Sequence, residues 1–246
     1  MKDERKILVT GASGYVGGRL VTALLEDGAD VRVFVRDANK AQSHSWANQV
    51  EIATGNATDF ESTKSALTGV HTAFYLLHSI NLGPNFDEIE AAMAKNFAKA
   101  AESCGVKQII YLGGINNDIK SSKHLNSREN TGKSLATTSV PVIELRAGII
   151  IGSGSASFEM LRHLTHRLPI MTTPKWVSNR TQPISVRDVL YYLRSAAKLV
   201  EPVNEIRDIG GPEVVTYAEM MQKFAKISGL PKRIIVQVPV LSPKLS

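Results

Sequence analysis

The stretch "KILVTGASGYVGG", residues 6–18, decides the fold of this chain. It opens with a short apolar run and continues with three evenly spaced glycines, Gly11, Gly14 and Gly17. From Tyr15 onward, apolar residues recur at helical spacing. A strand, a glycine-rich turn and a helix in this order are typical of the first βαβ unit of a dinucleotide-binding domain.

Each glycine has an expected role in that unit. The first lets the chain turn sharply, the second lets the backbone approach a pyrophosphate, and the third lets helix and strand pack closely. The N-terminus of the helix then offers free N–H groups and a partial positive charge to the phosphates. A plain tight turn between strand and helix remains the alternative.

Composition narrows the class of protein. The chain has 246 residues, 43% hydrophobic and 21% charged, with a formal net charge of +6. Its basic residues are scattered rather than clustered, so a solvated basic surface is favoured over a nucleic-acid patch, and a phosphate-bearing ligand would also suit the positive charge. A single cysteine, no run of about 18 apolar residues and no signal peptide favour a cytoplasmic protein without a membrane span.

Apolar strand patterns alternate with helical patterns along the first 150 residues, which implies βαβ units. The expected fold is α/β, a doubly wound parallel sheet with a small C-terminal lobe. No repeat or flexible linker interrupts the sequence, so residues 1–246 are expected to form a single domain. Within it, residues 1–150 form the dinucleotide-binding core and residues 151–246 form the lobe.

The tip of the second predicted strand bears on the choice of cofactor. It reads "VRDANK", residues 35–40, and so presents Arg36, Asp37 and Lys40. Arg36 and Lys40 favour a ribose 2′-phosphate and therefore NADP. Asp37 keeps NAD possible, because a carboxylate at this place bonds a ribose 2′-hydroxyl. The remaining alternative is that these residues are only surface charges.

Four segments together resemble the extended and atypical short-chain dehydrogenase/reductases. They are "TGASGYVG" (10–17), "LRAGIIIGSGS" (145–155), "QPISVRDV" (182–189) and "GGPEVVTYAEM" (210–220). The most similar group is that of bacterial NAD(P)H-binding proteins related to the nitrogen-metabolite-repression regulator. Several members continue into a further C-terminal domain, whereas this sequence stops at "SPKLS" (242–246). A short homologue and a trimmed chain both fit.

The resemblance implies a set of cofactor-binding residues along the carboxyl ends of the predicted strands. They are Gly11, Ser13, Gly14, Tyr15, Val16 and Gly17 in the loop, Arg36, Asp37 and Lys40 beside it, and Asn56, Ala57, Leu76, Leu77, His78, Asn96, Gly113 and Gly114 further along. Asn56 replaces an aspartate that many members carry near the adenine.

The family's catalytic set is a Ser after the fifth strand and a Tyr-x-x-x-Lys pair on the next helix. Gly113 and Gly114 stand where the Ser is expected, and the pair becomes His124 and Arg128. No Tyr occurs between Gly114 and Gly148. Three interpretations stay open: His124 is a substitute general acid, catalysis has been lost in a redox-sensing binder, or His124 is a surface residue.

The sequence therefore predicts an NADP(H)-binding, oxidoreductase-like protein, either an unusual reductase or a redox-sensing regulator. A non-catalytic assembly or interaction scaffold on the same fold is the alternative. Its small-molecule substrate is unknown, and a protein partner or a homo-oligomer is possible. No metal site is expected, because the histidines lack carboxylate partners at ligand spacing.

Overall fold

The computed structural model describes residues 5–78, 85–116 and 123–237, with the side chain of His124 left out. Two compact units are present. Unit 1 comprises Met1–Arg146 and Arg187–Asp208, and unit 2 comprises Ala147–Val186 and Ile209–Ser246. Each is described by itself.

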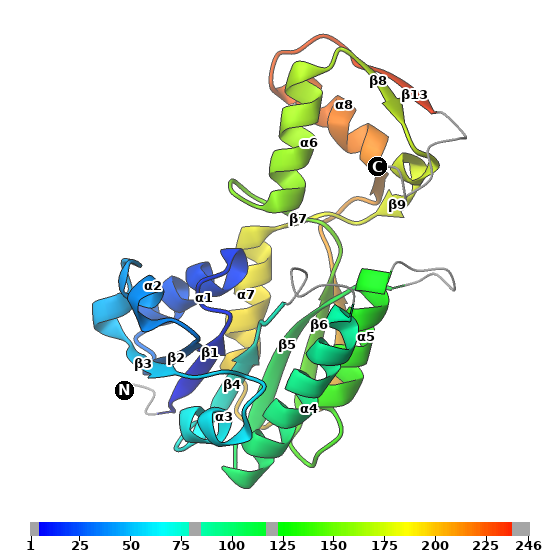
Figure 1. Cartoon of the computed structure of the whole chain (residues 1–246). Coiled ribbons are helices and arrows are strands. Elements are labelled where there is room, and N and C mark those ends of the chain that lie inside the picture. Colours follow the sequence, from blue (N-terminus) through cyan, green and yellow to red (C-terminus); the bar gives the residue numbers. More distant parts are fainter. Residues whose placement is uncertain (1–4, 79–84, 117–122, 238–246) are drawn as a thin grey trace. The chain divides into compact units, whose positions relative to one another are not determined.

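Unit 1 is built on a seven-stranded sheet in the order β11-β6-β5-β4-β1-β2-β3 (Figure 1). Its strands are β1 (Ile7–Thr10), β2 (Val31–Val35), β3 (Glu51–Thr54), β4 (Thr72–Tyr75), β5 (Gln108–Gly114), β6 (Val142–Ala147) and β11 (Glu205–Ile209). Strand β1 pairs in parallel with both β2 and β4, so the chain reverses its direction of winding there. The doubly wound α/β fold expected from the sequence is confirmed.

Helices cover the sheet on both faces (Figure 1). They are α1 (Tyr15–Glu26), α2 (Ala38–Gln42), α3 (Phe60–Leu67), α4 (Phe86–Ser103), α5 (Lys123–Leu135) and α7 (Val186–Ala197), with a 3-10 turn at Ala47–Gln49. Leu8, Ala73 and Ile109 lie side by side in register across three strands and belong to one buried cluster. Phe97 of α4 is fully buried in the same cluster, so α4 closes this face of the sheet.

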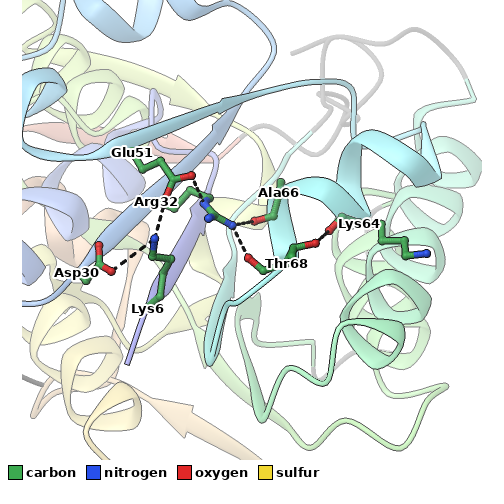
Figure 2. Close-up of polar contacts among 7 residues, drawn as sticks. All are labelled: Lys6, Asp30, Arg32, Glu51, Lys64, Ala66 and Thr68. Carbon is green, nitrogen blue, oxygen red and sulfur yellow. Dashed lines mark hydrogen bonds and ion pairs between the residues drawn. The ribbon is translucent and has the colours of Figure 1, made fainter. Parts of the chain in front are cut away.

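At the amino edge of the sheet, one arginine ties β2 to its neighbours (Figure 2). Arg32 forms an ion pair with Glu51 of β3 at 2.9 Å. The Arg32 guanidinium also donates to the carbonyl oxygens of Ala66 and Thr68, at 2.7 and 2.8 Å, where α3 ends. These acceptors have no partner within the helix, and a cation is favourable at a helix C-terminus. Arg32 therefore anchors α3 to the sheet.

The segment Arg187–Asp208 returns to unit 1 although the sequence suggested that everything after residue 150 lies in the lobe. Its strand β11 joins the edge of the sheet next to β6. Its helix α7 is held to α1 by Asp27, which accepts from Arg194 Nε at 2.7 Å and pairs with Lys198 at 3.0 Å. The boundary between the two units therefore differs from the expected boundary at residue 150, because Arg187–Asp208 contacts distant parts of the chain in unit 1.

The Asp27 ion pair predicts a pH-dependent contribution to stability. The hydrogen bond from Arg194 lowers the pKa of Asp27 from 3.8 to about 2. Because the folded pKa is depressed, this stabilisation is present above about pH 4 and is lost as the pH falls toward 2. Asp27→Asn is expected to lower the free energy of unfolding by about 1 kcal/mol at pH 7. Urea unfolding at pH 7, 4 and 3 measures the difference, which should shrink below pH 4.

Glu201→Gln serves as the matched control for that prediction. Glu201 is an exposed carboxylate in the same unit and has no ion pair among the described residues. Its substitution should change the free energy of unfolding little at any of the three pH values. A loss for Asp27→Asn that stays constant from pH 7 to pH 3 would show that the ion pair is not its source.

Unit 2 contains two helices, α6 (Ala156–Arg167) and α8 (Tyr217–Ile227), and a 3-10 turn at Lys175–Ser178. Three short strand pairs surround them: β7 (Ile150–Ile151) with β10 (Ile184–Ser185), β9 (Arg180–Thr181) with β12 (Val215–Thr216), and β8 (Ile170–Thr173) with β13 (Ile234–Gln237). Leu161, Met171 and Met221 form its core. Thr216 and Glu219 form a capping box at the start of α8.

Candidate nucleotide site in unit 1

The glycine-rich turn joins β1 to α1, and two of its glycines are required by the chain's own backbone. Gly11 has φ +66°, and a Cβ atom there would lie 2.4 Å from the carbonyl oxygen of Leu76. A Cβ atom on Gly17 would lie 2.2 Å from the carbonyl oxygen of Gly11. Neither position can accept a side chain without moving backbone. Gly11 and Gly17 thus bring β4, the turn and α1 into close contact.

Gly14 has more space around its Cα atom than Gly11 and Gly17 have. It is exposed, and a Cβ atom there would meet only the carbonyl oxygen of Gly11, at 3.1 Å. Gly14 is the N-cap residue of α1, but no side chain caps the helix and no acidic residue lies in its first turn. The N–H groups of the first turn are therefore available to an anionic ligand.

Thr10 fixes the turn to the neighbouring strand. The fully buried Thr10 hydroxyl donates to the carbonyl oxygen of Phe74 and accepts from the N–H of Leu76, both at 3.0 Å. The carboxyl ends of β1 and β4 are therefore held together at the turn. Sequence reasoning missed Thr10, although a hydroxyl at the end of an otherwise apolar strand was a visible signal.

Next to Gly14, the chain carries a polar atom without a partner. Tyr15 is half-buried, and within the described part of the chain its hydroxyl oxygen is buried and makes no hydrogen bond. The Arg19 guanidinium lies 4.0 Å from the centroid of the Tyr15 ring. Ser13 is exposed and Val16 is half-buried. A buried hydroxyl that makes no hydrogen bond within the described residues could be completed by a bound polar group.

At the tip of β2, the acidic and basic candidates are separated. Asp37 is the N-cap of α2, and its Oδ1 accepts from the backbone N–H groups of Asn39 and Lys40 at 2.9 and 3.2 Å. Arg36 and Lys40 are exposed, and neither side chain has a polar partner among the described residues. The carboxylate is thus engaged in capping, whereas both cations can meet a ligand.

The loop after β3 is ordered by two amides. Asn56 Oδ1 accepts from the N–H of Thr58 at 3.2 Å, which closes a turn. Asn96 of α4 donates to the carbonyl oxygen of Ala57 at 2.9 Å. Asn96 therefore holds the loop that carries Asn56 and the buried Ala57.

The three residues after β4, Leu76, Leu77 and His78, contact different parts of unit 1. The Leu76 backbone contacts the glycine turn, whereas the Leu77 side chain packs against the buried cluster between the sheet and α4. The His78 ring is 29% exposed, and its Nδ1 lies 3.4 Å from Oε1 of Glu90.

Two larger side chains fill the space beside the glycine pair of β5. A Cβ atom on Gly113 would lie 2.7 Å from Oε1 of Glu144, and one on Gly114 would lie 3.2 Å from Cδ of Arg128. Glu144 is buried and accepts from Arg146 Nε at 2.8 Å. The place where the family carries its Ser is thus occupied from two neighbouring elements.

The two predicted catalytic residues lie at the start of α5. Arg128 NH1 donates to the carbonyl oxygen of Leu112 at 3.0 Å, and burial lowers the pKa of its guanidinium. The carbonyl oxygen of Arg128 in turn accepts from the Tyr111 hydroxyl at 3.0 Å. The side chain of His124 lies outside the described residues, so its pairing with Arg128 stays a prediction.

A polar cluster that sequence reasoning did not assemble lies between α4 and α5. Glu90 of α4 is only 3% exposed. It accepts a very short hydrogen bond from the Ser127 hydroxyl and lies beside the His78 ring. Glu90 falls on the same helix face as Met93, Ala94 and Phe97, so a carboxylate on an apolar face was the signal that could have revealed it.

The described residues contain neither a candidate membrane span nor a candidate metal centre. In residues 5–78, 85–116 and 123–237, no helix is long and apolar enough to cross a membrane. The same part of the chain contains no group of three or more His, Cys, Asp or Glu residues placed to hold a metal ion.

Among curated proteins, the chain is similar to two oxidoreductases. It is 32% identical over 119 residues to a 3-beta-hydroxysteroid dehydrogenase of Mycolicibacterium neoaurum, covering 44% of this chain and 32% of that protein. It is 25% identical over 240 residues to the ceramide reductase of Caulobacter vibrioides, covering 93% and 72%. The chain thus spans about a third of the length of the dehydrogenase it matches.

Among solved structures, the triphenylmethane reductase of Citrobacter sp. in complex with NADP(H) superposes with a TM-score of 0.76 and 23% identity, covering 96% of this chain and 79% of that one. This likeness establishes the fold. The sequence model of the NmrA-like family matches residues 3–153, more than half of the chain. The resemblance to short-chain dehydrogenase/reductases is confirmed, and the chain belongs to the NmrA-like family.

Proposed function

We propose that this chain binds NADP(H) at the carboxyl edge of the unit 1 sheet and acts as an atypical oxidoreductase. One observation carries the proposal: the Gly11–Gly14 turn leads into a helix N-terminus that has neither a side-chain cap nor an acidic first turn. Such an end is suited to a pyrophosphate. The hydroxyl of Tyr15, the first residue of that helix, makes no hydrogen bond within the described residues, which is consistent with a ligand there. The solved complex of triphenylmethane reductase with NADP(H), on the same fold, supports a nicotinamide nucleotide.

The tip of β2 supports the phosphorylated dinucleotide. Asp37 Oδ1 already accepts two backbone N–H groups, which makes this carboxylate a poor partner for a ribose 2′-hydroxyl. Arg36 and Lys40 are exposed and close together in sequence. A guanidinium binds phosphate through charge-assisted hydrogen bonds. We therefore assign the 2′-phosphate to Arg36, with Lys40 beside it.

Arg36→Ala is expected to weaken NADPH binding about tenfold, the equivalent of one charge-assisted hydrogen bond, and to leave NADH binding unchanged. Fluorescence titration of the purified chain with each nucleotide measures both affinities. Lys99→Ala is the matched control, because Lys99 is an exposed cation near the C-terminal end of α4, at the opposite edge of the sheet. An equal loss for both nucleotides would contradict the role of Arg36.

A second candidate function is a redox-sensing binder that carries out no hydride transfer. The contacts beside Gly113 and Gly114 favour it, because a Ser at Gly113 would require the Glu144 carboxylate to shift. NADPH consumption in the presence of aldehydes and ketones distinguishes the two candidates. A chain that binds neither nucleotide would instead support a scaffold role.

A further inference from the structure

The cluster of His78, Glu90 and Ser127 joins three separate elements of unit 1. His78 follows β4, Glu90 lies in α4 and Ser127 lies in α5. Ser127 is 1% exposed and Glu90 is 3% exposed, whereas the His78 ring is 29% exposed. A buried carboxylate therefore lies between a buried hydroxyl and a ring that reaches solvent.

The contact between Glu90 and His78 bears on which ring nitrogen carries the proton. The Ser127 hydroxyl donates to Oε2 of Glu90, so the other carboxylate oxygen, Oε1, is left to face Nδ1 of His78 at 3.4 Å. A carboxylate accepts hydrogen bonds only, so it favours the ring form that carries its proton on Nδ1. Nε2 is then the nitrogen on the far side of the ring from Glu90.

Charged and ionisable groups on neighbouring elements act on the pair. The positive charge of Arg128, on α5, acts on His78, and the negative charge of Glu90 acts on Arg128. The hydroxyl groups of Tyr75 and Tyr111, on β4 and β5, also face the charge of Glu90. Burial lowers the pKa of the His78 ring, and the hydrogen bond with Glu90 opposes that shift.

The position of His78 connects the cluster to the candidate nucleotide site. His78 follows Leu76 by two residues, and the backbone of Leu76 contacts Gly11 of the glycine turn. Strands β4 and β1 are direct neighbours in the sheet. The exposed ring thus belongs to the same sheet edge as the turn.

We propose that His78 is the proton-transfer residue of this chain, with Glu90 and Ser127 as its positioning residues. The inference rests on the proposed function, because the reductant is NADPH. The substrate class is a carbonyl compound that is reduced to an alcohol. The ring replaces the Tyr and Lys that the sequence lacks.

The proposed step conserves atoms and electrons. When bound, the reduced nicotinamide nucleotide would supply a hydride, with its two electrons, to the carbonyl carbon. The carbonyl oxygen takes the proton of Nε2 from the doubly protonated ring, so the N–H bond breaks as the O–H bond forms. The ring becomes neutral and keeps its Nδ1 proton toward Glu90. Water then returns a proton to Nε2.

Reduction of 9,10-phenanthrenequinone and 4-nitrobenzaldehyde by NADPH tests the proposal. His78→Gln should lower kcat, measured at saturating NADPH, at least a hundredfold. His71→Gln is the matched control, because His71 precedes the other end of β4. Wild-type chain that binds NADPH but reduces neither probe would overturn the proposal and leave the NADPH site standing.

A second measurement addresses Glu90 apart from turnover. In ¹⁵N NMR spectra of the full chain, the neutral His78 ring should be protonated on Nδ1, and Ser127→Ala should reduce that preference. Glu90→Gln removes the contact that raises the pKa of His78, so the fall of kcat with rising pH should move to lower pH. A ring protonated on Nε2, or a pH profile that Glu90→Gln leaves in place, would overturn the positioning role.

Discussion

Alanine at Gly11 is expected to lower the free energy of unfolding by about 3–5 kcal/mol and to abolish NADPH binding. Two costs add at this position. The backbone has φ +66°, which L side chains rarely adopt, and the new Cβ atom would lie 2.4 Å from the carbonyl oxygen of Leu76. Since that oxygen belongs to the backbone of the adjacent strand connection, relief requires moving the turn or the chain after β4. Urea unfolding and NADPH titration measure the two effects.

Gly28→Ala separates the two costs. Gly28 has φ +78°, but a Cβ atom there would meet nothing within 4 Å. Gly28→Ala should lower the free energy of unfolding only by the cost of the backbone conformation, about 1–2 kcal/mol, and should bind NADPH normally. Equal losses for Gly11→Ala and Gly28→Ala would show that the contact with Leu76 costs nothing.

Gly11 also shows which features of the fold the sequence could predict and which it could not. The strand–turn–helix order around Gly11 is local, so its pattern predicted both the element boundaries and the glycine requirement. The partner of Gly11 is Leu76, which follows a different strand, and no local spacing reveals it. The sequence pattern assigned a sharp turn to Gly11 and close packing of helix and strand to Gly17, and at both positions a Cβ atom would meet the chain's own backbone.

The division into units failed to follow from the sequence for a similar reason. A linear reading placed all residues after 150 in one lobe, but the sheet edge recruits Glu205–Ile209 as β11. The contacts that hold α7 near α1, Asp27 with Arg194 and Lys198, join residues far apart in the chain. Single-residue charges at such distances carry no recognisable pattern.

The candidate site was predicted unevenly. The loop residues and the tip of β2 lie at the carboxyl edge of the sheet, because parallel strands end there together, and their binding roles stay predictions. The capping role of Asp37 was readable from its place before a short helix, but the resemblance directed attention to the ribose instead. The burial of Glu90 was not predicted from the sequence. Helix α4 carries several charged residues, and a glutamate in such a helix is expected to be exposed unless the buried face of the helix is known.

Serine at Gly113 is expected to destabilise the chain by about 1–3 kcal/mol and to restore no catalytic function. The sequence alone suggests that Gly113→Ser would rebuild part of the missing catalytic set. The structure predicts the reverse, because a Cβ atom at this position would lie 2.7 Å from Oε1 of Glu144. Glu144 is 5% exposed and bonded to Arg146, so its carboxylate has little freedom to withdraw. Urea unfolding gives the loss, and NADPH consumption with carbonyl probes gives the activity.

A double-mutant cycle identifies Glu144 as the cause. In a Glu144→Ala background the space beside Gly113 is open, so Gly113→Ser should cost less than half as much as in the native chain. Glu144→Gln is the matched control, since it removes the charge but keeps the volume, and the full cost should return there. If Gly113→Ser costs the same in all three backgrounds, the loss arises from the strand itself. If the cost follows the volume at residue 144, the glycine of β5 is coupled to a buried glutamate of β6, and both positions must change before a serine can be accommodated.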